Sequence, residues 1–584
     1  HKLREQTFMS IHLSRRRFLS HSAKSALVVA ATAVIEAKGG AVLVKSVAPA
    51  QSAAVQPLFA KLDEYIVNHM HQTGAPGLML ALANRDGLIR ASTYGFADTK
   101  AGLKVANETM FEIGSVSKSF VGLALLQLKE EGKLDFYKPV TEYLPWLKIT
   151  TKFEAITTHH LLTHSAGLPG APLLLDALLG ELWTAYEPGK RFLYSNTGYN
   201  ILGFLIEAVD KRPFAVAMRE RVLGPLGMTA SRPTITNDIR KNMAIGYEPL
   251  AEGKPFPLHG TLAEAQWLEV DIAAGSIAST PGDMAKYIRM LLNRGALPKG
   301  RLVSDESFSL FTKNAIESPY RGEPASYGYG LWVSDIEAHT RLRHTGGMVA
   351  FSSALDVDLT AGVGAFASVN ANMRGYRPVA VTKYAIDLFN ASLDRKPLPE
   401  PPPPPPWPEQ IKNATEYEGT YTSPNGRKLV LVADGEKLIL NQAGQRIALE
   451  RAAGDRFIVK HPDFDLYLLS FERENRVVTQ AVHGPDWYAG ERFTGPRAVE
   501  GNKEWEGFAG HYHNDSPWYG DTRIVCRRGR LYVDGVQPLT PRADGKFVLG
   551  NPDAPDWMAF ESIVNGRAMR LNLSGIIFRR MFTP

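Results

Sequence analysis

Residues 111–120 read FEIGSVSKSF, and the apolar run VGLALLQL follows them at residues 121–128. The run predicts a buried helix, so Ser115 stands at or near its N-terminus. There, unpaired N–H groups and the helix dipole favour developing negative charge. Lys118 lies three residues later and shares a helical face with Ser115. A lysine held there can lose its proton more readily and help to activate the hydroxyl. By itself, the tetrapeptide fits an N-cap serine followed by a surface lysine better than it fits a catalytic pair.

Two further motifs follow the serine motif along the chain, and their order is informative about the family. Tyr194-Ser195-Asn196 comes first, and His344-Thr345-Gly346-Gly347 comes later, in a segment that reads as a strand edge. Together with the serine motif, this order resembles the serine β-lactamase and penicillin-binding protein superfamily. The resemblance is to its class C-type branch, which includes D-alanyl-D-alanine carboxypeptidases, D-aminopeptidases and family VIII carboxylesterases. The segments LLTHSAGLP at 161–169 and AAGSIASTPGDMA at 273–285 resemble further motifs of that branch.

The resemblance covers roughly residues 55–392 and implies an α/β (α+β) fold. In that fold, an antiparallel sheet carries helices on its faces, and a helical subdomain stands beside it. Strand-like runs at 326–334, 341–356 and 363–370, followed by a helical pattern near 376–392, fit this architecture. We expect the active site between the two parts.

The resemblance also implies a role for each motif residue. Ser115 would be the nucleophile and form an acyl-enzyme, and Lys118 and Tyr194 would handle its proton. A nearby ammonium favours the phenolate form of a tyrosine, and the sequence leaves open which of the two side chains holds the proton. The Asn196 amide would position Lys118 and the substrate. The backbone N–H groups of Ser115 and Gly347 would form the oxyanion hole.

The third motif departs from most class C β-lactamases, which have lysine where this chain has His344. A neutral imidazole binds a substrate carboxylate less strongly than a permanent cation does. We therefore expect His344, Thr345 and Gly346 to serve a D-amino-acid peptide or a carboxyl ester rather than a β-lactam. The alternative is a catalytically silent relative that binds peptidoglycan fragments or a protein partner.

We expect neither a cofactor nor a metal. His160 and His164 have a helical spacing that could bind zinc, but Leu161 occupies the place of the glutamate in H-E-x-x-H. The resemblance makes His164 a buried framework residue instead. Cys526 is the only cysteine, so no internal disulfide is possible.

Residues 1–50 resemble an export signal. They hold eight Lys/Arg and two acidic residues, so the rest of the chain has a formal charge of zero and suggests no nucleic-acid partner. The segment SRRRFLS at 14–20 resembles the twin-arginine consensus, and an apolar stretch at 25–35 and an A-x-A site at 48–50 follow it. About eleven apolar residues are too few to span a bilayer, so no stable membrane anchor is expected. We expect a periplasmic or secreted enzyme.

The remaining chain divides into four parts. Residues 51–396 would form the hydrolase domain, and the proline-rich segment 397–408 a stiff linker. Residues 409–500 and 501–584 form an internal repeat, in which YEGTY at 417–421 matches FAGHY at 508–512. We expect two small all-β antiparallel barrels, which resemble the lipocalin-like C-terminal domains of D-aminopeptidases. They would narrow access to Ser115 or bind a separate ligand. The oligomeric state stays open.

Overall fold

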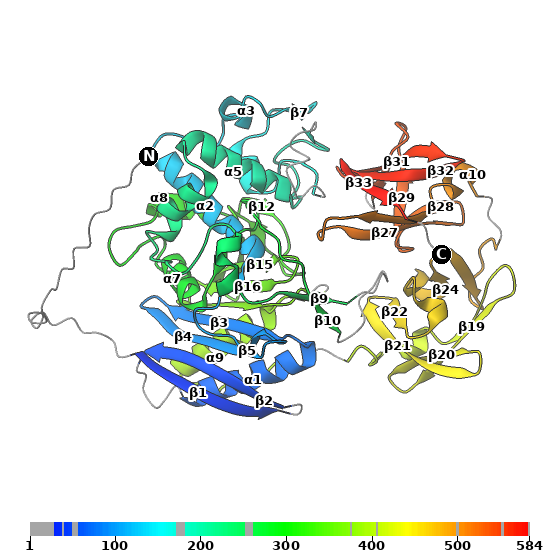
Figure 1. Cartoon of the computed structure of the whole chain (residues 1–584), viewed down its shortest axis with the longest axis horizontal. Coiled ribbons are helices and arrows are strands. Elements are labelled where there is room, and N and C mark those ends of the chain that lie inside the picture. The colour runs from blue at the N-terminus through cyan, green and yellow to red at the C-terminus, as the bar shows by residue number, and fades with distance from the viewer. Residues whose placement is uncertain are drawn as a thin grey trace, which may run out of the picture.

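The computed structural model describes residues 28–37, 40–49, 56–170, 182–250, 261–373, 376–403, 407–497, 501–549 and 554–581. They form an α/β domain, on the left of Figure 1, and two β-barrels on the right, barrel 1 and barrel 2 in chain order. The structure confirms the predicted fold class.

The main sheet of the α/β domain is antiparallel. Its strand order is β1-β2-β4-β3-β17-β16-β15-β14-β13-β12, and β5 pairs with β4 off this path. The strands are β1 (Val28–Ala37), β2 (Gly40–Pro49), β3 (Gly77–Asn84), β4 (Gly87–Asp98), β5 (Leu103–Lys104), β12 (Ile316–Glu317), β13 (Ser326–Tyr327), β14 (Trp332–Ile336), β15 (His339–Gly347), β16 (Ser352–Asp358) and β17 (Val363–Val369). Shorter pairs join β6 (Phe111–Glu112) to β11 (Ala278–Ser279), β7 (Ile149–Thr150) to β8 (Leu182–Trp183), and β9 (Tyr247–Pro249) to β10 (Leu262–Glu264).

Helices cover both faces of the central strands. Helices α1 (Gln56–Thr73) and α9 (Val379–Leu393) lie on one face, and α7 (Pro281–Leu292) lies on the other. Side chains alternate along a strand, so β3 serves both layers. Leu78, Leu80 and Leu82 pack with α1 and α9, whereas the residues between them join the cluster that contains α7.

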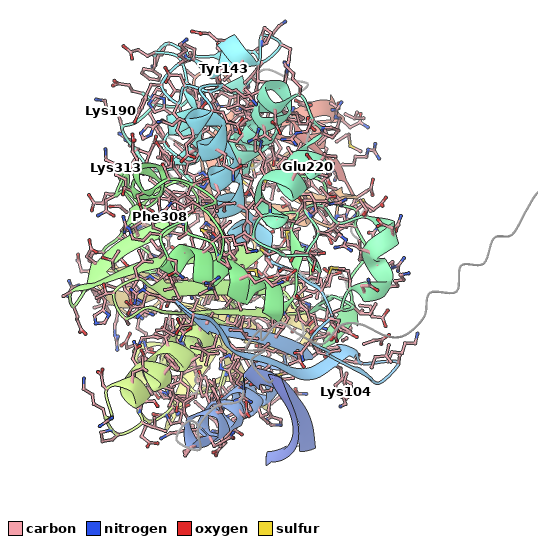
Figure 2. All side chains as sticks on the ribbon, turned by 90° about the vertical axis from the view of Figure 1, so that its left-hand side faces the viewer. Lys104, Tyr143, Lys190, Glu220, Phe308 and Lys313 are labelled. Atoms are coloured by element: carbon pink, nitrogen blue, oxygen red, sulfur yellow. The ribbon has the colours of Figure 1, made fainter. Side chains whose placement is uncertain are left out.

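The helical subdomain surrounds one central helix. Helix α2 (Ser117–Glu130) is buried at every position from Ser117 to Leu126, as expected for a helix that is apolar all round. The other helices are α3 (Val140–Tyr143), α4 (Thr158–Leu162), α5 (Asn196–Asp210), α6 (Phe214–Met218), η4 (Arg219–Leu223), η5 (Asn237–Asn242) and α8 (Asp305–Phe311). In Figure 2, Tyr143 and Lys190 lie toward the helical end of the domain, and Lys104 lies toward the sheet.

Residues 28–35 of the apolar stretch expected inside an export signal form part of a strand pair. Strands β1 and β2 make a hairpin, and β2 pairs with β4 from Val44↔Tyr94 to Val47↔Ala91. The twin-arginine segment 14–20 lies outside the described residues, so export stays a prediction. Among the described residues, no helix combines the length and apolar character needed to cross a membrane.

Each half of the C-terminal repeat closes into an eight-stranded antiparallel barrel, as predicted. Barrel 1 contains β18 (Gly419–Thr422), β19 (Lys428–Asp434), β20 (Lys437–Gln442), β21 (Gln445–Ala453), β22 (Arg456–Val459), β23 (Leu469–Glu474), β24 (Val477–His483) and β25 (Asp486–Gly490), with η6 (Ala414–Glu416) and η7 (Pro462–Phe464). Barrel 2 contains β26 (Gly510–Asn514), β27 (Gly520–Arg527), β28 (Arg530–Val533), β29 (Gln537–Pro541), β30 (Phe547–Leu549), β31 (Trp557–Val564), β32 (Arg567–Leu573) and β33 (Ile576–Arg580), with α10 (Lys503–Glu506).

A shared tyrosine contact shows the repeat in three dimensions. The buried Tyr421 hydroxyl donates to the Tyr417 carbonyl at 2.9 Å, and the buried Tyr512 hydroxyl donates to the Phe508 carbonyl at 2.7 Å. Both acceptors lie four residues upstream, so the two barrels begin with the same local structure.

The linker and barrel 2 both contact the α/β domain. Tyr384 of α9 donates to the Pro399 carbonyl at 3.1 Å, so the first part of the linker rests on the domain. In barrel 2, the loop before β31 reaches the domain. Trp183 Nε1 donates to the Pro555 carbonyl at 2.8 Å, and the Trp183 and Trp557 rings lie 5.8 Å apart.

Candidate active site

Ser115 lies in a tight turn pressed against strand β15. The turn is η2 (Gly114–Val116), directly before α2. Gly114 has φ +54°, and a Cβ there would lie 2.8 Å from the Gly347 nitrogen. Only glycine allows both this conformation and this approach. The chain thus brings the two predicted oxyanion donors, the N–H groups of Ser115 and Gly347, onto neighbouring backbone segments.

Lys118 is fully buried beside the Ser115 hydroxyl. Its Nζ lies 3.0 Å from Ser115 Oγ, 2.8 Å from Asn196 Oδ1 and 2.7 Å from the Ala274 carbonyl. A neutral amine can donate to the Asn196 and Ala274 oxygens and accept from the Ser115 hydroxyl. No carboxylate among the described residues pairs with it, and burial holds the pKa of Lys118 well below its ordinary value. The structure thus favours a neutral amine, which can accept a proton from Ser115.

Tyr194 lies on the other side of Ser115. The residue is half-buried, Lys118 Nζ lies 4.9 Å from the centre of its ring, and its hydroxyl interacts with Ser115. Burial raises the pKa of Tyr194 above its ordinary value, although the Ser115 hydrogen bond and the charge of Arg377 act in the opposite direction. Burial thus favours the neutral phenol at Tyr194 over the phenolate that a nearby ammonium would favour.

Asn196 is fixed by the start of helix α5. The preceding residue, Ser195, is the N-cap, and its hydroxyl accepts from the Gly198 N–H at 3.1 Å. Asn196 then points its carbonyl oxygen at Lys118, as expected. The Ala274 carbonyl reaches Lys118 Nζ from the segment before α7, where the Ala274 N–H donates to Asn200 Oδ1 at 3.2 Å.

Strand β15 brings the third motif to the same place. A Cβ on Gly346 would lie 2.0 Å from the Ile113 carbonyl, so this strand touches the turn that carries Ser115. Thr345 is partly exposed beside it. A Cβ on Gly347 would lie 2.1 Å from Nη2 of Arg377, a cation that the sequence motifs do not include. Arg377 lies immediately before α9, outside every motif.

His344 is turned into the protein. It is 1% exposed, its Nδ1 lies 2.7 Å from the Thr345 carbonyl and its Nε2 lies 3.0 Å from the Tyr327 hydroxyl. A carbonyl only accepts, so Nδ1 carries the proton and Nε2 accepts from Tyr327. Burial and the neighbouring Lys118 lower the pKa of His344 to about 3. His344 is thus a neutral residue of the site wall, 6.4 Å from Tyr194 between ring centres.

His160 and His164 hold backbone groups. His160 Nδ1 accepts from the Thr157 N–H at 3.3 Å, and His164 Nδ1 accepts from the Ser195 N–H at 3.0 Å. The His164 ring is buried and lies 4.2 Å from the Tyr194 ring. The structure thus places His164 in the framework behind Tyr194, as the resemblance implied.

Comparisons with known proteins agree with this arrangement. The model of the Beta-lactamase family matches residues 62–387. Protein flp of Staphylococcus aureus (strain N315) is 27% identical over 314 residues, which are 50% of this chain and 59% of the relative. A beta-lactamase of Yersinia enterocolitica is 32% identical over 242 residues, which are 40% of this chain and 58% of the relative. The chain thus spans less than two thirds of the length of these curated relatives.

A solved structure is similar over a larger share of the chain. The octameric penicillin-binding protein homologue from Pyrococcus abyssi superposes with a TM-score of 0.53 and 25% identity, covering 74% of this chain and 99% of its own. Because the family model matches more than half of the residues, this chain belongs to the beta-lactamase family.

Proposed function

We propose that the protein is a serine hydrolase that forms an acyl-enzyme at Ser115 and hydrolyses a small ester or amide. One observation carries this proposal: the Ser115 hydroxyl lies 3.0 Å from a buried lysine that lacks an acidic partner among the described residues. A neutral amine at this distance is a general base for the hydroxyl.

The chemistry follows from the protonation states. The Ser115 proton moves to Lys118 as Oγ attacks the substrate carbonyl, and the N–H groups of Ser115 and Gly347 stabilise the resulting oxyanion. Tyr194 gives its phenolic proton to the leaving group and recovers a proton from Lys118. Water then hydrolyses the acyl-enzyme, with the same residues acting in reverse.

The neutral state of His344 supports D-amino-acid peptides and carboxyl esters over β-lactams. The imidazole is buried and donates to a backbone carbonyl, so it offers no cation to a substrate carboxylate. A β-lactam carboxylate would have to use Arg377, whose guanidinium lies beside Gly347.

Contacts of barrel 2 near Tyr194 support a role in selecting small substrates. Asp556 Oδ2 accepts from the Gly170 N–H at 3.1 Å, and a Cβ on Gly170 would lie 3.2 Å from the Tyr194 carbonyl. The barrel is thus attached next to the segment that carries the phenol. In this proposal, barrel 2 narrows access to Ser115.

The location and partners are part of the same proposal. The twin-arginine-like segment 14–20 supports export to the periplasm or the outside. The formal net charge of residues 51–584 is zero, which argues against a nucleic-acid partner. The short apolar stretch at 25–35 argues against a stable membrane anchor.

A fluorescent phosphonate that labels activated serines tests the proposal on the full chain. Labelling should occur in the wild type and in Ser309→Ala, which removes an exposed serine of α8, and it should vanish in Ser115→Ala. Folded wild-type protein that stays unlabelled would overturn the proposal and favour a silent binder. Rates with p-nitrophenyl acetate, p-nitrophenyl butyrate, D-alanine p-nitroanilide and nitrocefin then rank the substrates, and nitrocefin should be slowest.

A further inference from the structure

A small pocket lies beside the Ser115 turn, between the α/β domain and barrel 2. Its lining includes Glu112, Trp267, Met348, Phe351 and Trp518. Glu112 precedes Ser115 by three residues, and Met348 directly follows Gly347 of the oxyanion strand. The cavity has a volume of about 70 Å³, which is room for a few water molecules or one small polar group.

Glu112 carries an acidic group that forms no ion pair with any residue in the described ranges. Glu112 belongs to the short strand β6, which pairs with β11, and it lies half-buried in the wall of the pocket. No hydrogen bond or ion pair to the Glu112 carboxylate is found in the described part of the chain. Burial raises the pKa of Glu112 to about 8. An unpartnered carboxyl group is unfavourable in such surroundings and is typical of a binding site.

Aromatic rings complete the pocket. Trp267 comes from the α/β domain, and Trp518 comes from the loop between β26 and β27 of barrel 2, where it packs on the domain core. The guanidinium carbon of Arg240, an exposed residue at the rim, lies 5.3 Å from the centre of the Trp267 ring, so this ring already accepts a cation. A carboxyl group and indole rings together are the chemistry that recognises an ammonium ion.

We propose that this pocket binds an ammonium group of the substrate, with Glu112 as its counter-ion and Trp518 as the wall that barrel 2 supplies. The inference rests on the proposed function and narrows its substrates to esters and amides that carry a free amine. A bound ammonium supplies the missing opposite charge and returns Glu112 to its ionised form. The size of the cavity favours a primary ammonium over a bulky quaternary one.

Matched pairs of amides test the charge alone. The p-nitroanilides of D-alanine, β-alanine and 4-aminobutyric acid each have a neutral partner in which a methyl group replaces the ammonium: those of isobutyric, butyric and pentanoic acid. We would measure the concentration at which each compound slows phosphonate labelling of Ser115 in the full chain at pH 7. This readout needs no turnover of the anilides. Absence of labelling would count against the proposed function, whereas equal protection by both members of every pair would overturn only the ammonium site.

In the wild type, the amine should protect at a concentration at least about tenfold lower than its neutral partner for at least one spacer length. This ratio should fall to within about threefold of unity in Glu112→Gln. It should be retained in Glu108→Gln, which makes the same change at an exposed position outside the pocket. Trp518→Leu should also lower the ratio, and it keeps the test decisive if Glu112→Gln does not fold. A preference that persists in folded Glu112→Gln and in Trp518→Leu would overturn the proposal.

Discussion

Two adjacent glycines of strand β15 should respond very differently to one added methyl group. A Cβ on Gly346 would lie 2.0 Å from the Ile113 carbonyl and 2.3 Å from Ser353 Oγ. These two atoms already hydrogen bond to each other at 2.8 Å, so neither can withdraw freely. At Gly347, the near atoms all belong to the end of the Arg377 side chain, which can rotate away.

The expected magnitudes follow from these contacts. Real Cβ contacts stay above about 3.0 Å, so Gly346→Ala must move β15 away from the Ser115 turn by about 1 Å. A displacement of this size in a catalytic arrangement costs about 10²-fold in rate, and the loss of one oxyanion donor costs about 10²- to 10³-fold. We therefore expect Gly346→Ala to slow acylation by about 10²- to 10³-fold and to lower stability by about 1–3 kcal/mol. For Gly347→Ala, we expect a loss of no more than about tenfold.

The assay is the second-order rate constant for phosphonate labelling of Ser115, with thermal unfolding followed by circular dichroism as a check of folding. Gly346→Ala protein that is folded and reacts within about threefold of the wild type would refute the reasoning. So would Gly347→Ala protein that reacts more slowly than Gly346→Ala. Either result would mean that the contact of β15 with Ile113 does not set the position of the oxyanion donors.

Three further predictions test the proton acceptor, the buried histidine and barrel 2. Lys118→Met keeps the bulk but removes the base, so labelling of Ser115 should fall by about 10²- to 10⁴-fold, and an unchanged rate would exclude Lys118 as the base. The pKa of His344 is about 3 in the folded protein and near 6.5 in the unfolded chain. Between these two values the unfolded chain binds more protons, so the free energy of unfolding falls as the pH drops from 6.5 to 3. At pH 5 the loss is about 2 kcal/mol, and urea unfolding of His344→Gln at pH 7.5 and 5 should show a smaller difference than the wild type. Trp183→Ala removes the hydrogen bond to Pro555 and the contact with Trp557. The hydrolysis rate of p-nitrophenyl octanoate should therefore rise relative to that of p-nitrophenyl acetate. An unchanged ratio of the two rates would show that barrel 2 does not select substrates by size.

The parts of the site that could be predicted are those set by local geometry and motif order. The three-residue spacing of Ser115 and Lys118 fixes their common face, because helix geometry depends on the local chain. The contact of the Ala274 carbonyl with Lys118 could not be predicted from the sequence. It joins residues 156 positions apart, and it involves a backbone atom that any residue could supply. Arg377 and Trp518 could not be predicted either, since only tertiary packing brings them to the site.

His344 shows the limit of interpreting a motif letter by letter. Its position in the third motif suggested a side chain facing the substrate. Alternation along β15 places His344 on the same face as Gly346, where it meets Tyr327 inside the protein. The apolar stretch at 25–35 has a related ambiguity, because a short apolar run fits the core of an export signal and a strand equally well. The structure has strand β1 there, and the export prediction depends on residues that the structure does not describe.

Burial gives Lys118 and Tyr194 complementary roles. Low polarity disfavours the charged form of any group, so it lowers the pKa of the lysine and raises that of the tyrosine. The same environment that withholds a counter-ion from Lys118 thus leaves a neutral amine and a neutral phenol on either side of one hydroxyl. Acyl transfer needs a proton acceptor for the nucleophile during attack and a proton donor for the leaving group when it departs. If Lys118 were charged and Tyr194 a phenolate, Tyr194 would be the proton acceptor and Lys118 the proton donor. That arrangement would bury two charges, and the described residues provide no further counter-ion for either. In the proposed mechanism, the neutral pair is therefore the resting state from which the reaction starts.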